Sequence, residues 1–219
     1  MLRRTVRRVA RHPAVRWLRA KEYERHYRTG RGGRFFGAFA SLSEAQSWDP
    51  SASNSSYDDP ELVGLNLDGF LEVQLFDWPV IHALNRFAPT SLTDLGGHIG
   101  VKYYAFREHL ELGDDFQWHV VELPAMVQAG ERERGARGGS HLRFHTKQAN
   151  ALSPCLLCSG SLQYVDRTLE ETLDTAGDPE LLVLNKLPLT EGTGFWTLEN
   201  FKGARVPYRV FSESSVRQI

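Results

Sequence analysis

A turn with three glycines and an acid one strand further along the chain are the residues of this sequence best suited to chemistry. Residues 92–100 read Leu-Thr-Asp-Leu-Gly-Gly-His-Ile-Gly, which is typical of the end of a buried strand, a tight turn and the start of a helix. The apolar run 118–121 ends at Glu122. Glycines let the main chain approach a ligand closely, and a carboxylate can accept both hydroxyl protons of a ribose. The pattern therefore predicts a nucleoside-binding site.

The spacing of these residues favours one nucleoside cofactor over another. The turn fits Asp-x-Gly-Gly-x-x-Gly, with Asp94, Gly96, Gly97 and Gly100, and not the Gly-x-Gly-x-x-Gly of dinucleotide enzymes. This difference favours S-adenosylmethionine over NAD. The competing interpretation is an ordinary tight turn from strand to helix, with Glu122 as a solvated carboxylate at the end of a strand.

The elements that must position these residues alternate along the chain from Ala88 onward. Such alternation of strand and helix patterns implies βαβ units and a mostly parallel sheet, that is, a doubly wound α/β fold. The apolar runs predict strands at 90–95, 117–122, 142–144, 155–159 and 181–184, with helices at 100–111, 124–134 and 166–176. Ligands of such sheets bind at the carboxyl ends of the strands, where the glycine turn and Glu122 both lie.

The sequence resembles the class I S-adenosylmethionine-dependent methyltransferases, and more narrowly a family of bacterial methyltransferases found among polysaccharide and O-antigen genes. The match covers roughly residues 35–212. The segments that carry it are Phe36-Gly37-Ala38-Phe39, Ser43-Glu44-Ala45, Thr93-Asp94-Leu95-Gly96-Gly97-His98-Ile99-Gly100 with Tyr104, Trp118-His119-Val120-Val121-Glu122-Leu123-Pro124, Leu142-Arg143-Phe144, Cys158-Ser159-Gly160-Ser161-Leu162-Gln163-Tyr164, Thr197-Leu198-Glu199-Asn200 and Pro207-Tyr208.

The resemblance implies a role for each site residue. The three glycines would pass beneath the methionine part of S-adenosylmethionine, Asp94 would orient its amino group, and Glu122 would bind its ribose. Ser159 would also contact the cofactor. Gln163 would bond a small-molecule or glycan acceptor where the methyl donor meets it. A capped turn into the next helix is the alternative for this last loop.

Two histidines are candidate bases. His98 stands in the turn where such proteins often have a small residue, and His145 follows the third strand. An unperturbed histidine titrates near neutrality, so either could accept a hydroxyl proton. The commoner alternative for each is a polar histidine at the surface.

The two cysteines, Cys155 and Cys158, form a C-x-x-C that suggests redox chemistry or zinc. They lie inside an apolar strand, where positions three apart point to opposite faces. We therefore expect small buried hydrophobic residues, and no structural metal.

The amino-terminal segment is strongly basic. Residues 1–34 hold twelve Lys or Arg against Glu22 and Glu24, so they carry +10 of a chain whose net charge is −1. Helical spacing over 2–28, interrupted at Pro13, suggests a basic arm that lies on an anionic membrane surface. A nucleic-acid arm is disfavoured because few aromatic residues accompany the basic ones. The remaining alternative is a solvated basic helix that packs on the acidic rest of the protein. Without a secretory signal or an apolar span, the expected location is cytoplasmic, peripheral at the inner membrane face.

These patterns divide the chain into a basic arm (1–34), a helical cap or substrate segment (35–88) and a Rossmann-like core (89–219). The carboxyl-terminal edge looks shortened, because residues 205–211 could supply at most one of the two strands that complete a class I core. An uncovered edge strand invites pairing with a second copy, so a homodimer is an expectation. Two rival functions remain: a degenerate methyltransferase fold that acts as a membrane or protein adaptor, and an NAD-dependent oxidoreductase.

Overall fold

The computed structural model describes residues 12–29, 31–48, 70–201 and 204–219. The chain divides into two compact units, each with its own contacts. We call residues 56–194 and 209–219 the sheet unit, and residues 1–55 and 195–208 the arm unit. These units do not follow the expected boundaries at residues 34 and 88. The helix before residue 88 packs into the core of the sheet unit, whereas residues 35–48 pack with the basic helix.

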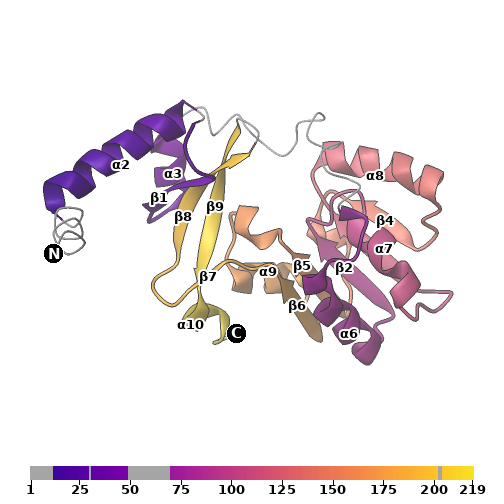
Figure 1. Cartoon of the computed structure of the whole chain (residues 1–219). Coiled ribbons are helices and arrows are strands. Elements are labelled where there is room, and N and C mark those ends of the chain that lie inside the picture. Colours follow the sequence, from indigo (N-terminus) through magenta and orange to yellow (C-terminus); the bar gives the residue numbers. More distant parts are fainter. Residues whose placement is uncertain (1–11, 30, 49–69, 202–203) are drawn as a thin grey trace. The chain divides into compact units, whose positions relative to one another are not determined.

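The sheet unit is built on five parallel strands in the order β4-β3-β2-β5-β6 (Figure 1). Their bounds are β2 (Ser91–Leu95), β3 (Gln117–Val121), β4 (Leu142–His145), β5 (Cys155–Ser159) and β6 (Leu181–Asn185). Runs rich in Leu and Val suit strands that are covered on both faces. The five expected strands are confirmed. The chain leaves β4 and returns to the other side of β2, so the order reverses between β2 and β5, where open α/β sheets bind ligands.

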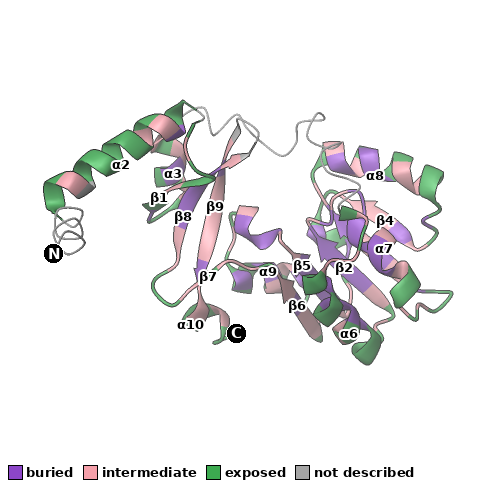
Figure 2. Ribbon diagram, viewed as in Figure 1, coloured by how far each residue is buried: buried purple, intermediate pink, exposed green. Residues whose placement is uncertain are grey.

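Helices cover both faces of this sheet, as a doubly wound fold requires. On one face the helices α6 (Trp78–Phe87) and α7 (Val101–Phe106) pack with Leu92, Trp118 and Leu157. On the other face α9 (Leu169–Ala176) packs with Leu156 and Cys158. The helix α8 (Pro124–Arg137) joins β3 to β4, and 3-10 turns lie at Leu75–Asp77, Arg107–His109, Gln148–Asn150 and Leu162–Tyr164. Figure 2 shows the buried strands between helices whose outer faces are exposed.

Local signals explain where these helices begin and end. Pro124 stands in the first turn of α8, where its missing N–H costs nothing. The hydroxyl of Thr168 accepts from the N–H of Glu171 while the Glu171 carboxylate accepts from the N–H of Thr168, which caps α9 at its start. Gly177, with a φ of 74°, ends the helix.

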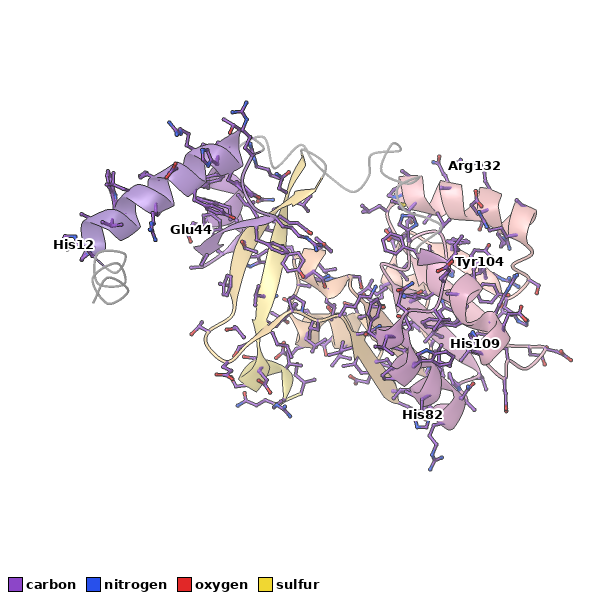
Figure 3. All side chains as sticks on the ribbon, in the orientation of Figure 1. His12, Glu44, His82, Tyr104, His109 and Arg132 are labelled. Atoms are coloured by element: carbon purple, nitrogen blue, oxygen red, sulfur yellow. The ribbon has the colours of Figure 1, made fainter. Side chains whose placement is uncertain are left out.

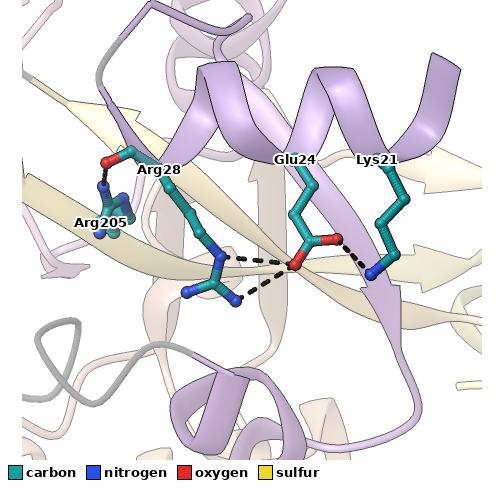
Figure 4. A network of polar contacts seen from close by, with 4 residues as sticks. All are labelled: Lys21, Glu24, Arg28 and Arg205. Atoms are coloured by element: carbon teal, nitrogen blue, oxygen red, sulfur yellow. Dashed lines mark hydrogen bonds and ion pairs between the residues drawn. The ribbon is translucent and has the colours of Figure 1, made fainter. Parts of the chain in front are cut away.

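The arm unit contains α2 (Pro13–Arg28), β1 (Phe35–Phe39), α3 (Leu42–Trp48) and β8 (Phe195–Phe201), with the first part of β9 (Ala204–Ser212). Tyr27 is fully buried, and its hydroxyl donates to the carbonyl oxygen of Leu198 at 2.6 Å. Its ring stacks on Phe36 at 5.1 Å between centroids. Figure 4 shows Glu24 between Lys21 (3.1 Å) and Arg28 (3.3 Å), while Arg205 donates to the carbonyl oxygen of Arg28.

The carboxyl-terminal segment differs from the expectation. Residues 205–211 supply one strand, β9, as expected, but β8 before it was not predicted, and neither strand pairs with the parallel sheet in the described residues. Instead β8 pairs with β1 in antiparallel register, with Phe36 opposite Leu198. The last residues of β9 pair in parallel with the short strand β7 (Leu189–Thr190). Among the described helices, none combines the length and the apolar character needed to cross a bilayer.

Candidate functional site

The glycine turn follows β2 directly, and two of its glycines have no room for a side chain. Gly96 has a φ of 70°, which L residues rarely adopt, and a Cβ there would lie 2.4 Å from the Cβ of Ser161. A Cβ on Gly97 would lie 2.5 Å from Oδ2 of Asp94. Gly100, with a φ of 85°, leads into α7. Positions 96 and 97 therefore require glycine, because the side chains of Ser161 and Asp94 occupy the space beside them.

Asp94 lies beneath this turn. Its side chain is 1% exposed, and Nε1 of Trp118 donates to Oδ2 at 3.1 Å. Burial raises the pKa of this carboxyl to about 7, against the lowering effects of the Trp118 hydrogen bond and the Lys102 charge. Its buried position makes Asp94 a support of the turn. Trp118 is buried, and nothing in the sequence predicted its hydrogen bond to Asp94.

Glu122 follows β3 and faces the glycine turn. Its Oε1 accepts from the main-chain N–H of His98 at 3.1 Å, and its Oε2 accepts from the N–H of Leu123 at 2.9 Å. The neighbouring strands β2 and β3 are parallel, so their carboxyl ends lie at the same edge. The structure thus brings together the turn and the acid that the sequence singled out.

The two candidate bases lie in different surroundings, and no described contact joins them. His98 has a φ of 57°, its Nδ1 is buried without a hydrogen bond to a described residue, and burial lowers its pKa. Nε2 of His145 lies 2.9 Å from Nδ1 of His119 on β3. Burial lowers the pKa of both His119 and His145, and between two neutral rings the N–H of one donates to the bare nitrogen of the other.

The loop after β5 lies against the glycine turn through Ser161. Ser159, the last residue of β5, accepts from Nδ2 of Asn185 at 3.2 Å. Nε2 of Gln163 donates to the carbonyl oxygen of Gly160 at 2.8 Å. Within the described chain, Oε1 of Gln163 and Oγ of Ser161 are buried and have no hydrogen-bond partner. Buried polar atoms ordinarily have a hydrogen-bond partner, so these two call for an explanation.

A buried ion pair near this loop was not found from the sequence. Nζ of Lys102, on α7, lies 2.7 and 2.8 Å from the carboxylate oxygens of Asp77, and both residues are buried. Nδ2 of Asn185 adds a contact of 3.3 Å to Asp77. The one available signal was a lysine inside the apolar run 101–106; nothing in the spacing pointed to Asp77.

Cysteines and other histidines that could in principle bind a metal or act as nucleophiles lie outside this site. Cys155 and Cys158 are free, buried and packed on opposite faces of the sheet, as expected, and burial raises the pKa of Cys155 to about 12. His82 is exposed on α6, and His109 follows α7 at the end away from the glycine turn (Figure 3). In the part of the chain that is described, no three His, Cys, Asp or Glu residues are placed to hold a metal ion.

Comparison with solved structures returns S-adenosylmethionine-dependent methyltransferases. An O-methyltransferase family protein from Burkholderia thailandensis is 18% identical, with a TM-score of 0.37, over 55% of this chain and 38% of its own. A methyltransferase from Geobacter sulfurreducens, in complex with S-adenosyl-L-homocysteine, is 13% identical, with a TM-score of 0.38, over 67% of this chain and 54% of its own.

Human N-acetylserotonin methyltransferase, in complex with S-adenosylmethionine, is 12% identical, with a TM-score of 0.41, over 71% of this chain and 42% of its own. The chain therefore spans less than two thirds of the length of each of these three proteins. The sequence itself matches no protein-family model and no curated protein.

Proposed function

We propose that this protein transfers a methyl group from S-adenosylmethionine to a small acceptor at the carboxyl ends of β2, β3 and β5. The observation that carries the proposal is the hydrogen bond from the N–H of His98 to Glu122. It sets a carboxylate beside the main chain of the glycine turn, which follows β2 at the reversal of strand order. A carboxylate at the carboxyl end of a strand in such a sheet can accept from the hydroxyls of a ribose.

The residues present fit this cofactor. Glu122 would hold the ribose, and the main chain at Gly96 and Gly97 would lie along the methionine tail. Asp94 would support the turn from below. Bound there, S-adenosylmethionine supplies a methyl group on a positively charged sulfur.

The contribution of the chain itself is alignment. Holding the acceptor oxygen in line with the methyl group can lower a barrier by about 7–11 kcal/mol. Oε1 of Gln163 is a buried acceptor atom without a partner among the described residues, and it can orient an acceptor hydroxyl. His98 is the candidate to receive the hydroxyl proton, and burial lowers its pKa, which favours the neutral ring that a base requires. The resemblance to polysaccharide-associated methyltransferases makes a sugar or glycan precursor the proposed acceptor.

Calorimetric titration with S-adenosylhomocysteine tests this proposal. We expect saturable heat with the unaltered chain and a loss of affinity in Glu122→Ala. The variant Glu133→Ala serves as the matched control, because Glu133 pairs with Arg137 on the outer part of α8. No heat with S-adenosylhomocysteine would favour the adaptor, and quenching of protein fluorescence by NADH alone would favour the oxidoreductase.

We also propose that the basic arm brings this activity to an anionic membrane surface, where lipid-linked glycans are built. The support is the exposure of two apolar side chains on α2, Trp17 at 61% and Leu18 at 58%. The same helix carries five Lys or Arg against two Glu. Deleting residues 1–30 should abolish co-sedimentation with vesicles that contain anionic lipid. Unchanged co-sedimentation would rule the proposal out.

A further inference from the structure

A second lysine lies at the candidate site with a positive charge that the described chain does not neutralise. Lys186 follows the last residue of β6 with a φ of 56°, and it is exposed. Its Nζ lies 4.5 Å from the centre of the Phe76 ring, and Nζ of Lys102 lies 5.7 Å from the same centre. One aromatic ring thus holds two ammonium groups near each other.

The charges around this ring do not balance. The carboxylate near these two lysines is that of Asp77, and Nζ of Lys102 lies 2.7 Å from its Oδ1. Lys186 has no hydrogen bond or ion pair to another described residue. Although the residue as a whole is exposed, partial burial of its amine lowers the pKa of Lys186, the Lys102 charge lowers it further, and Asp77 acts in the opposite direction. The cluster of Asp77, Lys102 and Lys186 therefore carries one excess positive charge.

The position of Lys186 connects this charge to the proposed acceptor site. A Cβ on Gly160 would lie 3.3 Å from Cδ of Lys186, so the lysine stem runs along the loop after β5. Ser161 of the same loop lies against Gly96. In the sheet order, β6 lies beyond β5 on the side away from β3 and Glu122. The cofactor would occupy the β3 side of the site, next to Glu122. Lys186 therefore borders the opposite side, where the acceptor would bind.

We propose that Lys186 binds an anionic group, a carboxylate or a phosphate, on the methyl acceptor. The assignment to an acceptor rests on the proposed function, whereas the anion site rests on the charges alone. Pairing an ammonium with an oxyanion gives a strong charge-assisted hydrogen bond. With Gln163 available for a hydroxyl, the acceptor class is a small hydroxyl-bearing acid or phosphate ester.

Lysine acetylation followed by mass spectrometry tests the anion site, with inorganic phosphate and acetate as separate probes at constant ionic strength. The chain has five lysines, so each can be followed. We expect saturating probe to slow acetylation of Lys186 by about tenfold, because a bound anion stabilises the protonated amine. The more effective probe tells whether phosphate or carboxylate is preferred. Lys147, which is exposed after β4 of the same sheet, should be unaffected.

Calorimetry with the same probe checks the assignment independently. Lys186→Gln should abolish probe binding, Lys147→Gln should leave it unchanged, and both variants should bind S-adenosylhomocysteine as the unaltered chain does. Equal slowing of Lys186 and Lys147, or unchanged probe binding by Lys186→Gln, would overturn the proposal. If the probe binds at Lys186 but S-adenosylhomocysteine gives no heat, the anion site stands and the proposed function fails. If S-adenosylhomocysteine binds but the probe does not, the anion site fails and the proposed function stands.

Discussion

The main-chain N–H of His98 donates to Oε1 of Glu122 at 3.1 Å, which joins the turn after β2 to the acid after β3. The two residues are 24 positions apart in the chain. Their contact results from the parallel pairing of the two strands, which places both carboxyl ends at one edge. It fixes the carboxylate beside the main chain of the turn, and the ligand-binding role that we propose depends on that geometry.

Glu122→Gln should weaken binding of S-adenosylhomocysteine by about tenfold to a hundredfold, since hydrogen bonds to charged groups contribute about 1.5–3 kcal/mol. The amide keeps the shape of the side chain but loses the charge and part of the acceptor capacity. Calorimetry measures the affinity, and circular dichroism checks that the fold is retained. Equal affinities of the variant and the unaltered chain would remove Glu122 from the site.

Gly97→Ala should destabilise the protein, because its Cβ would lie 2.5 Å from Oδ2 of the buried Asp94. Overpacking of this kind costs about 1–3 kcal/mol of unfolding free energy. Urea denaturation measures the loss. Gly113→Ala is the matched control, because a Cβ there would meet nothing within 4 Å. Equal stability of the two variants would show that the turn has room for a side chain.

Because of its raised pKa, Asp94 should make the free energy of unfolding decrease as the pH rises through the acidic range. Its pKa is about 7 in the folded protein against an ordinary value of 3.8. Between these values the folded state holds a proton that the unfolded state has released, so the unfolding free energy decreases with pH and levels off above about pH 7. The whole decrease amounts to about 4 kcal/mol at most.

Asp94→Asn should remove this contribution, because an amide does not titrate and can still accept from Trp118. Urea denaturation of both proteins between pH 4 and pH 8 gives the comparison. The variant should gain stability relative to the unaltered chain as the pH rises. Parallel curves would mean that Asp94 is ionised at acidic pH despite its burial.

Lys102→Met should cost about 3–5 kcal/mol of unfolding free energy, because it leaves the Asp77 carboxylate buried without its partner. Lys21→Met, in an exposed pair with Glu24, should cost less than about 1 kcal/mol. The double variant with Asp77→Asn should be more stable than Lys102→Met alone, since no unpaired charge remains. If the second substitution lowers stability further, the Asp77–Lys102 pair does not account for the loss.

The sequence predicted the five parallel strands. It also predicted that the glycine turn and Glu122 lie together at the carboxyl ends of the strands. Both predictions rest on local patterns, namely short apolar runs and the residues that directly follow them. Burial of Cys155 and Cys158 on opposite faces followed from the two-residue period of a strand in the same way.

Contacts between distant segments could not be predicted in this way. Asp77, Lys102 and Asn185 come from three separate elements, and no spacing rule relates them. Strand β8 was missed because its partner β1 lies near the start of the chain, with Phe36 opposite Leu198. The expected helix over 2–28 is confirmed from Pro13 onward, and residues 1–11 lie outside the described part.

A crystal structure with S-adenosylhomocysteine tests the central claim most directly. We expect the ribose hydroxyls within hydrogen-bond distance of the Glu122 carboxylate and the amino-acid tail along the main chain of Gly96 and Gly97. The sulfur should point toward the loop that contains Gln163. A ligand bound elsewhere, or a ribose that makes no contact with Glu122, would contradict the account.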